Sequence, residues 1–435
     1  MARGEGRNGG SMTGVLELRD HFQSEFDRAS RKLPGFGSAR KAAMERFAAL
    51  GLPTGAEESW RFTDITPIAE TPFKPVARPG DPSRVADLAR GPLQACQIAF
   101  VDGLHAPRLS KLELPAGVTV EPIPFRNAAI DAYLTKLAPV DGRAFTALNT
   151  AFMRDGAYVR VAKGVRFDTP IHLLFLSTDR GAPYVTHPRV LVVVEEGARV
   201  SLVESFVGIS GVYLTNAVTE VAVGDGAHVE HTKVQRESHQ AYHVAALQVR
   251  QGRQSVFKSH SIALGAAISR MDTGTELAGE GAEVTLNGLF EGTGRQIVDN
   301  HTTIDHVSPH TTSRELFKGI LGGQAHGVFD GRIVVRAGAQ KTNAMQASRN
   351  LLLSKEAIVN TKPQLEILAN DVKCKHGATI GQLDDDVLFY LRSRGIGLAD
   401  ARRLLVHAFA GEILDQVAVE AVRTQLGGCL FMMVH

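Results

Sequence analysis

Apolar and polar positions divide the chain into three stretches with different periods. Over residues 15–50 the apolar side chains recur at helical spacing. From about Tyr158 to about Gln340, short runs rich in β-forming residues are separated by glycine and carry almost no helical periodicity. Helical spacing returns after the acidic cluster Asp384–Asp386, which is typical of a helix N-terminus. The pattern predicts a β-rich centre between two helical regions.

A short phrase recurs through the β-rich centre. It consists of an acidic residue, glycine and alanine followed by alternating residues, and its last copy is looser. The glycines of the four copies are Gly197, Gly226, Gly281 and Gly338. Their spacing is close to one, two and two units of about 28 residues, so half-way copies are expected at Gly252–Val256 and near Pro309–Thr311. The phrase is also a common turn before a strand, but a fixed period of this length is typical of a solenoid whose coils pack on one another.

This period predicts the fold class. We expect a mainly β protein whose core is a right-handed parallel β-helix, capped by helical N- and C-terminal regions. The glycine-rich, charged start of the chain indicates disorder, and a proline-dense stretch indicates a connector. The predicted parts are a disordered lead-in at 1–14, an N-terminal helical region with connector at 15–92, a β-rich region at 93–380 with its β-helix core at about 156–380, and a C-terminal helical domain at 381–435.

Composition and charge narrow the function without identifying it. The 435 residues include 48 basic and 46 acidic side chains, a formal charge of +2, which argues against a nucleic-acid partner. Three scattered cysteines argue against a disulfide framework and for a reducing compartment. The most apolar run, Val190–Val194, is far shorter than the roughly 20 residues that cross a membrane. We therefore expect a cytoplasmic protein with no membrane or nucleic-acid partner.

The segment around Cys374 and His376 is the strongest candidate for chemistry. In an extended segment residues i and i+2 lie on the same face, so the thiol and the imidazole can reach one metal ion or one sulfur-bearing intermediate. The flanking Lys373 and Lys375 would favour the thiolate. A buried cysteine that only fills space is the alternative. Since a tetrahedral zinc or iron centre needs about four ligands, the others would come from elsewhere in the fold or from a partner.

His301, His306 and His310 form a second candidate cluster. Three histidines within ten residues are possible metal ligands. In a strand, however, His306 and His310 would share one face and His301 the other, and hydrogen bonding along a solenoid explains such residues equally well. The chain has no phosphate loop and no dinucleotide fingerprint, so we do not expect it to hydrolyse nucleotides by itself.

Several longer stretches resemble the SufB/SufD family, the scaffold subunits of the SUF iron–sulfur cluster assembly system. An N-terminal element, Glu57–Asp64, contains Glu58–Thr63 and is similar to the family's Glu-x-Trp-[Lys/Arg]-[Tyr/Phe]-Thr sequence. The other matching stretches lie at 305–321, 346–354, 363–367, 371–384 and 389–396. Cys374–Ala378 with Gly381–Asp384 is similar to the SufD branch, and Phe389–Ser393 lacks the cysteine that the SufB branch carries in the corresponding helix.

The resemblance implies a function as well as a fold. It implies a non-catalytic subunit with a SufB-type partner docked along its β-helix and a SufC-type ATPase on its C-terminal helical domain. A transient iron–sulfur cluster would form at the subunit interface, where His376 contributes a ligand and Cys374 lies nearby; involvement of a flavin stays open. The competing hypothesis is a stand-alone β-solenoid metalloenzyme that uses His301, His306 and His310.

Overall fold

The computed structural model describes residues 8–90, 93, 96–123, 125 and 127–432, and side chains between residues 18 and 428. Residues 1–7 of the predicted disordered lead-in therefore lie outside the described residues. Within the remainder of that lead-in the prediction was wrong, because helix α1 already begins at Asn8. Composition suggested disorder, but the helix is stabilised further along by Leu18, Phe22 and Phe26, which are buried.

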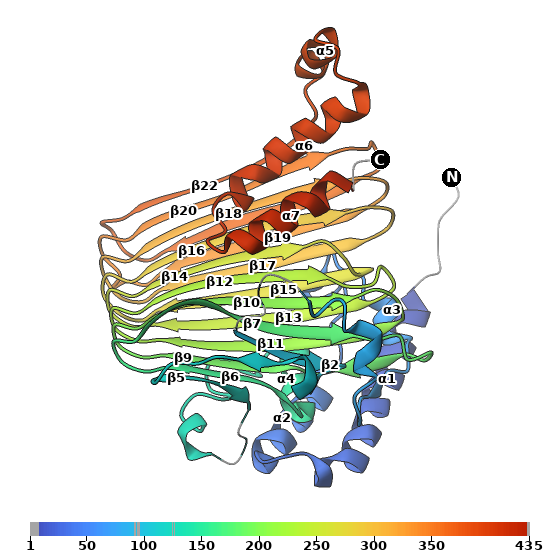
Figure 1. Ribbon diagram of the computed structural model, residues 1–435, viewed down its shortest axis with the longest axis vertical. Coiled ribbons are helices and arrows are strands. Elements are labelled where there is room, and N and C mark those ends of the chain that lie inside the picture. Colours follow the sequence, from blue (N-terminus) through green and yellow to red (C-terminus); the bar gives the residue numbers. More distant parts are fainter. Residues whose placement is uncertain (1–7, 91–92, 94–95, 124, 126, 433–435) are drawn as a thin grey trace.

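Two large sheets form the centre of the described part of the chain, and strands alternate between them (Figure 1). Sheet A contains β1 (Lys74–Pro75), β5 (Val118–Pro122), β6 (Gly156–Val161), β8 (Tyr184–Thr186), β9 (Arg189–Val194), β11 (Tyr213–Val223), β13 (Tyr242–Gln251), β15 (Ile268–Leu277), β17 (Ile297–His306), β19 (His326–Val335) and β21 (Ile358–Ile367). Sheet B contains β2 (Cys96–Val101), β3 (Leu104–His105), β4 (Lys111–Leu112), β7 (Arg166–Ser177), β10 (Arg199–Gly208), β12 (His228–Arg236), β14 (Val256–Ala263), β16 (Glu283–Gly292), β18 (Thr312–Leu321), β20 (Asn343–Leu352) and β22 (Lys373–Gln382).

From β9 and β10 onward, each strand pairs in parallel with the strand two positions later in the chain. The chain therefore winds as a β-solenoid, and the prediction of a mainly β protein with a parallel β-helix core is confirmed. One coil is 27 residues long at the pair Val256↔Glu283 and 31 residues long at Thr312↔Asn343.

The repeated phrase marks the turn of each coil. At each turn one residue has a positive φ between 51° and 72°, and its N–H donates to a carbonyl of the next coil at 2.7–3.2 Å. These residues are Gly197, Gly226, Gln254, Gly281, His310 and Lys341. The half-way copies predicted near 252 and 309 are thus confirmed by Gln254 and His310. Gly338 was the wrong marker, because Lys341 takes the turn position in a coil that is longer than the average period.

Aromatic rings and small residues fill the solenoid interior. Phe100, Phe175 and Phe206 stack with centroids 4.9 and 4.7 Å apart. Gly288 leaves room for Phe317, since a Cβ at that glycine would lie 2.2 Å from the ring. Stacked rings in one part of the interior and a glycine facing a ring in another both give close packing between coils.

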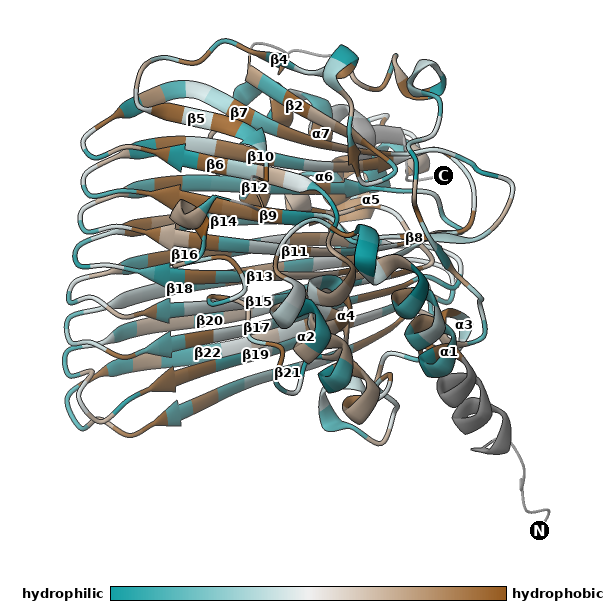
Figure 2. Ribbon diagram, turned by 90° about the horizontal axis from the view of Figure 1, so that it is seen from below, coloured by the Kyte–Doolittle hydropathy of each residue, from teal (hydrophilic) through white to brown (hydrophobic). Residues whose placement is uncertain are grey.

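Helices cover the outer face of sheet A (Figure 2). They are α1 (Asn8–Ala29), α2 (Gly37–Leu50), α3 (Thr66–Ala69) and α4 (Ala144–Phe152). The 3₁₀ turns of the chain lie at Ser30–Lys32, Glu58–Trp60, Pro82–Val85, Pro107–Leu109 and Ala128–Ile130, and Val85 packs on sheet B instead. Phe22, Phe47 and Phe152 share one cluster with Leu214 of β11 and Ile268 of β15. The N-terminal helical unit thus also takes a helix, α4, from the predicted β-rich region.

Helices also cover the outer face of sheet B. Val406 and Ile413 of α6 (Leu398–Leu414) and Val422 of α7 (Glu420–Met432) pack on Ile262 of β14 and Ile320 of β18. Helix α5 (Asp385–Ser393) projects beyond the stack of strands (Figure 1). The predicted helical regions are therefore present, and they lie mainly along the sides of the solenoid. No helix in the described part of the chain is long and apolar enough to span a membrane.

Candidate functional site

Cys374 and His376 lie on β22, the last strand of sheet B. In the register with β20, Cys374 pairs with Ala344 and His376 pairs with Gln346, and both β20 residues are buried. Cys374 packs against the interior cluster, so these two positions continue an inward row of the sheet. The prediction that they share one face is confirmed. His376 is exposed because no strand of the described residues follows β22 in sheet B.

The chemistry of the thiol differs from the prediction. Burial raises the pKa of Cys374, and a hydrogen bond with the backbone of Ala344 lowers it only in part. The expected activation by Lys373 and Lys375 is wrong, because both are exposed and alternate residues of a strand point to opposite faces. The thiol must therefore lose its proton when it binds a metal.

Below His376, two polar side chains form the floor of the site. Nε2 of Gln346 donates to Oε2 of Glu315, the inward residue one coil deeper, at 2.6 Å. Burial raises the pKa of Glu315 to about 7. A Cβ at Gly331 on the opposite sheet would lie 2.3 Å from Nε2 of Gln346, so the glycine makes room for this side chain. Sequence reasoning assigned no role to these residues, because only the strand register places them beneath His376.

The ligand set on this chain is small. Among the described residues no group of three or more His, Cys, Asp and Glu side chains could hold a metal ion. A thiol and an imidazole suit iron or zinc, and both metals need further ligands. That these ligands come from a partner stays a prediction.

The second predicted cluster does not converge. His301 points outward from β17, where Nε2 lies 3.0 Å from Oδ1 of Asp299, and this carboxylate holds the pKa of His301 above its ordinary value despite the opposing effect of burial. His306 is fully buried, with Thr311 at 2.7 Å and Ser313 at 2.9 Å, and burial lowers its pKa to about 4. The alternative of hydrogen bonding inside the solenoid is therefore confirmed for His306.

His310 belongs to neither face of a strand. Strand β17 ends at His306, and His310 occupies an exposed turn with φ 60°. The prediction that His306 and His310 share a strand face was wrong, because the coil turns between them. The three histidines cannot serve as one metal site in this fold.

The N-terminal element Glu58–Thr63 runs along the outer face of sheet A. The guanidinium of Arg270 lies 3.7 Å from the centroid of the Trp60 ring, and Oγ1 of Thr63 donates to Asp299 at 2.5 Å. Glu58 forms an ion pair with Lys362 of β21. The element thus fixes the N-terminal helices to three coils of the solenoid, at β15, β17 and β21.

Two apolar surfaces stay uncovered. One lies at the end of the stack, where β21 and β22 are the last strands of the two sheets in the described structure. Its exposed side chains are Ile358, Ile367, Leu368 and Ile380. The other lies on α5 and the start of α6, where the exposed side chains are Val387, Phe389, Tyr390, Leu398 and Leu404.

Comparison with known proteins relates this architecture to cluster assembly. Residues 175–409 match the family model described as SUF system FeS cluster assembly, SufBD core domain, and residues 17–173 match the SufBD protein N-terminal region. An iron–sulfur cluster assembly SufBD family protein of Synechocystis is 36% identical over 407 residues, covering 90% of this chain and 89% of that protein. The iron–sulfur cluster assembly protein SufD of Escherichia coli is 32% identical over 386 residues, covering 88% of this chain and 89% of that protein.

Proposed function

Because the chain belongs to the SufBD family of iron–sulfur cluster assembly proteins, we propose that it acts as a non-catalytic SufD-type subunit that holds part of a nascent cluster. The observation that carries this proposal is the position of Cys374 and His376. They provide two ligands of the types that bind iron, at the end of the solenoid where β22 is the last strand of the described chain. A site with two ligands binds a nascent cluster weakly by itself. The site is complete only when a partner supplies the remaining ligands.

A SufB-type subunit is the proposed partner at this end. The outer edges of β21 and β22 carry backbone groups that another sheet edge can pair with. Exposed Ile358, Leu368 and Ile380 add apolar surface beside these edges. A partner docked there lies next to His376 and supplies the remaining ligands.

Each side chain has a distinct part in binding the cluster, which is the cargo of the reaction. The exposed imidazole of His376 binds iron through a ring nitrogen. The thiol of Cys374 releases its proton as it binds. Gln346 and Glu315 fix the floor of the site, which limits the movement of the inward row.

A SufC-type ATPase is proposed to dock on α5 and the start of α6. Phe389 is 73% exposed and Tyr390 is 55% exposed, on a helix that projects away from the solenoid (Figure 1). Large aromatic side chains at such exposure are typical of a protein interface. ATP hydrolysis takes place in the partner.

Reconstitution tests the cluster site. The chain is co-expressed with SufB-type and SufC-type subunits and then supplied with iron and sulfide. We expect His376→Ala to lower cluster content, read from visible absorption, by about tenfold or more, since one lost ligand or its support costs at least that much affinity. His239→Ala, which removes another exposed histidine, should leave cluster content unchanged. Equal cluster content in wild type and His376→Ala contradicts the proposed site, and stoichiometric metal bound tightly by the isolated chain contradicts the scaffold function.

Pull-down tests the ATPase surface. Phe389→Asp places a charge on the exposed apolar surface of α5 and should weaken retention of the ATPase at least about tenfold, because central aromatic residues dominate such interfaces. Thr424→Asp makes a similar change at an exposed position of α7 and serves as the control. Circular dichroism should be the same for both variants. Retention of the ATPase by Phe389→Asp at the wild-type level argues against docking on α5.

A further inference from the structure

A cavity of about 300 Å³ lies between the N-terminal helical unit and the outer face of sheet A, on a different side of the molecule from Cys374 and His376. Its walls come from the loop at Leu50–Pro53, the element at Glu57–Trp60, the segment Gly142–Thr146 and outward residues of β13, β15 and β17. The cavity has no part in the proposed function.

The start of helix α4 lines this cavity and is uncapped. Arg143 occupies the N-cap position, makes no side-chain cap hydrogen bond, and the first turn contains no acidic residue. The N–H groups of Ala144, Phe145 and Thr146 have no partner among the described residues, because the first helical bond is donated by Ala147. A nine-residue helix with such a start presents free donors and the positive end of its dipole to the cavity.

Two side chains add unpaired donors to the same cavity. Gln248 of β13 is only 8% exposed, and its Nε2 has no hydrogen-bond partner in the described structure. One terminal nitrogen of Arg143 is also buried without a partner. Buried polar atoms are almost always hydrogen-bonded, so two unpaired donors beside one cavity indicate a missing acceptor.

The acidic groups of the cavity wall are already engaged. Asp272 receives two hydrogen bonds from Arg270, at 2.8 and 3.1 Å. Glu57 accepts the N–H of Thr54 at 3.2 Å. Asp299, next to the cavity wall, binds Arg270, Thr63 and His301. The buried unpaired side-chain atoms beside the cavity are both donors, from Gln248 and Arg143, which favours an anion.

We propose that this cavity binds the phosphate group of a small phosphorylated molecule, held by the α4 N-terminus, Arg143 and Gln248. Helix N-termini with free N–H groups bind phosphate, and arginine matches its oxygens with paired donors. A phosphate has enough acceptor oxygens for three backbone N–H groups and two side chains, whereas a carboxylate has two oxygens. The cavity exceeds the size of the anion alone, so the rest of the molecule lies against Leu50, Pro53 and Phe145.

Trp60 provides the measurement, because it is the only tryptophan of the chain and lines the cavity. The full-length chain is titrated with inorganic phosphate and with a phosphate monoester such as AMP, at ionic strength fixed with sodium chloride. We expect a saturable change in Trp60 fluorescence and a rise in melting temperature with both ligands. The monoester should bind more tightly, since it also fills the remainder of the cavity, and acetate should bind at least about tenfold more weakly.

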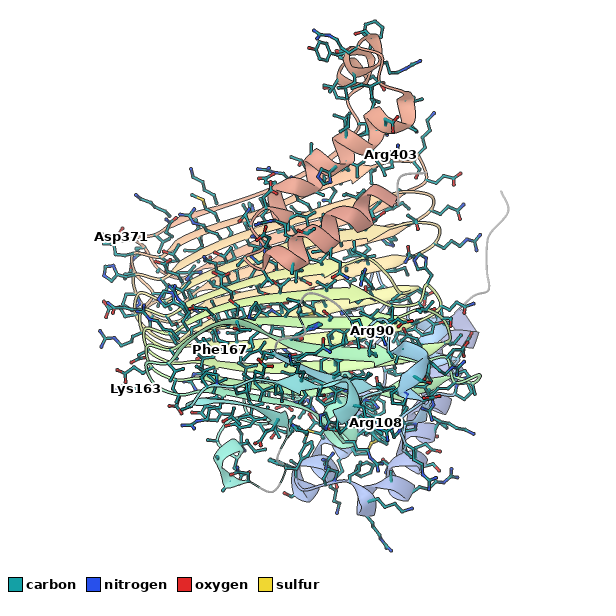
Figure 3. All side chains as sticks on the ribbon, viewed as in Figure 1. Arg90, Arg108, Lys163, Phe167, Asp371 and Arg403 are labelled. Atoms are coloured by element: carbon teal, nitrogen blue, oxygen red, sulfur yellow. The ribbon has the colours of Figure 1, made fainter. Side chains whose placement is uncertain are left out.

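Arg143→Asp is the decisive variant. An aspartate at the N-cap satisfies the free N–H groups from within the chain and removes the cation, so the melting temperature without ligand should not fall while phosphate affinity falls by about tenfold or more. Gln248→Glu keeps the shape of the side chain and opposes the anion, so it should weaken binding without preventing folding. Arg108→Asp makes the same charge change at an exposed position outside the cavity wall and should bind as wild type does (Figure 3).

Three results would overturn the proposal. The first is no response of fluorescence or melting temperature to either ligand up to about ten millimolar, a concentration above typical cellular levels of small ligands. Another is equal phosphate affinity in Arg143→Asp, Gln248→Glu and Arg108→Asp. The last is acetate binding as tightly as phosphate, which would mean that the site does not select phosphate.

Discussion

The middle coils of the solenoid and its last described coil have the same backbone conformation, but their inward side chains differ in burial. In β18 and β20 the inward residues Glu315, Gln346 and Ser348 are buried by the coils above them. In β22 the next residues of the same rows are largely exposed, because no described strand follows. The same inward row is therefore core in the middle of the stack and a ligand-bearing surface at its end.

Two histidines show the consequence of this difference. His306 and His376 both occupy inward positions, but His306 is enclosed by Thr311 and Ser313, and burial lowers its pKa to about 4. His376 has no hydrogen-bond partner among the described residues and is exposed. An imidazole whose nitrogens are both hydrogen-bonded serves the fold, and one without partners is available to a metal. Residue type alone does not separate the two roles.

Truncating one large side chain in each region to alanine should give the largest difference in the free energy of unfolding. Phe329 of β19 is fully buried in the interior cluster, whereas Ile380 of β22 is 49% exposed. Phe329→Ala should lower the free energy of unfolding by about 3–5 kcal/mol, and Ile380→Ala should change it by less than about 0.5 kcal/mol in the isolated chain. Denaturant unfolding followed by circular dichroism measures both. Similar losses for the two variants would mean that the end coil is as well packed as the middle.

Removing the buried carboxyl of Glu315 should have a smaller and pH-dependent effect. Its folded pKa of about 7 lies above the value near 4.5 expected for an unfolded chain, so the folded state binds an extra proton between these values. Stability from this group is complete below about pH 4.5 and is lost as pH rises to about 7. Glu315→Gln should therefore match wild type near pH 4.5 and be more stable by roughly 3 kcal/mol at pH 8.

Melting curves of the two proteins across this pH range provide the test. Glu291, whose pKa burial also raises to about 7, is present in both proteins, so its contribution cancels in the difference. A difference that stays constant with pH would show that Glu315 does not titrate as described.

Substitutions at the positive-φ turn residues should have the smallest effect on the free energy of unfolding. The effect should have opposite signs at Gly226 and Gln254. Gly226 has φ +65° and no atom within 4 Å of a Cβ built on it, so Gly226→Ala tests backbone strain alone. It should cost about 1 kcal/mol. Gln254 has φ 51° at the same position of the next coil, and Gln254→Gly should stabilise by up to about 1 kcal/mol. Thermal unfolding that moves in the same direction for both variants would contradict the equivalence of these turns.

Sequence periodicity was sufficient for the solenoid and for Cys374 and His376 on one face of a strand. The period was readable because every coil repeats one turn with a left-handed residue, and glycine occupies three of the six turns, at Gly197, Gly226 and Gly281. It failed at Lys341, because a longer coil moved the turn away from Gly338. It also failed for His301, which contacts Asp299 two residues earlier on β17 and Arg270 on the neighbouring strand β15, because only the strand register brings Arg270 to this pair.

The sequence by itself determined most of the elements, the repeat and the pairing of a thiol with an imidazole, because these depend on neighbours within a few residues along the chain. Only the tertiary structure decided that the last coil is uncovered, that the thiol of Cys374 is not activated by its lysines, and that the start of α4 faces a cavity with unpaired donors. These properties depend on burial and on contacts between distant segments. An inward side chain is buried when another coil packs on its own coil, and this depends on the arrangement of all the coils in the solenoid.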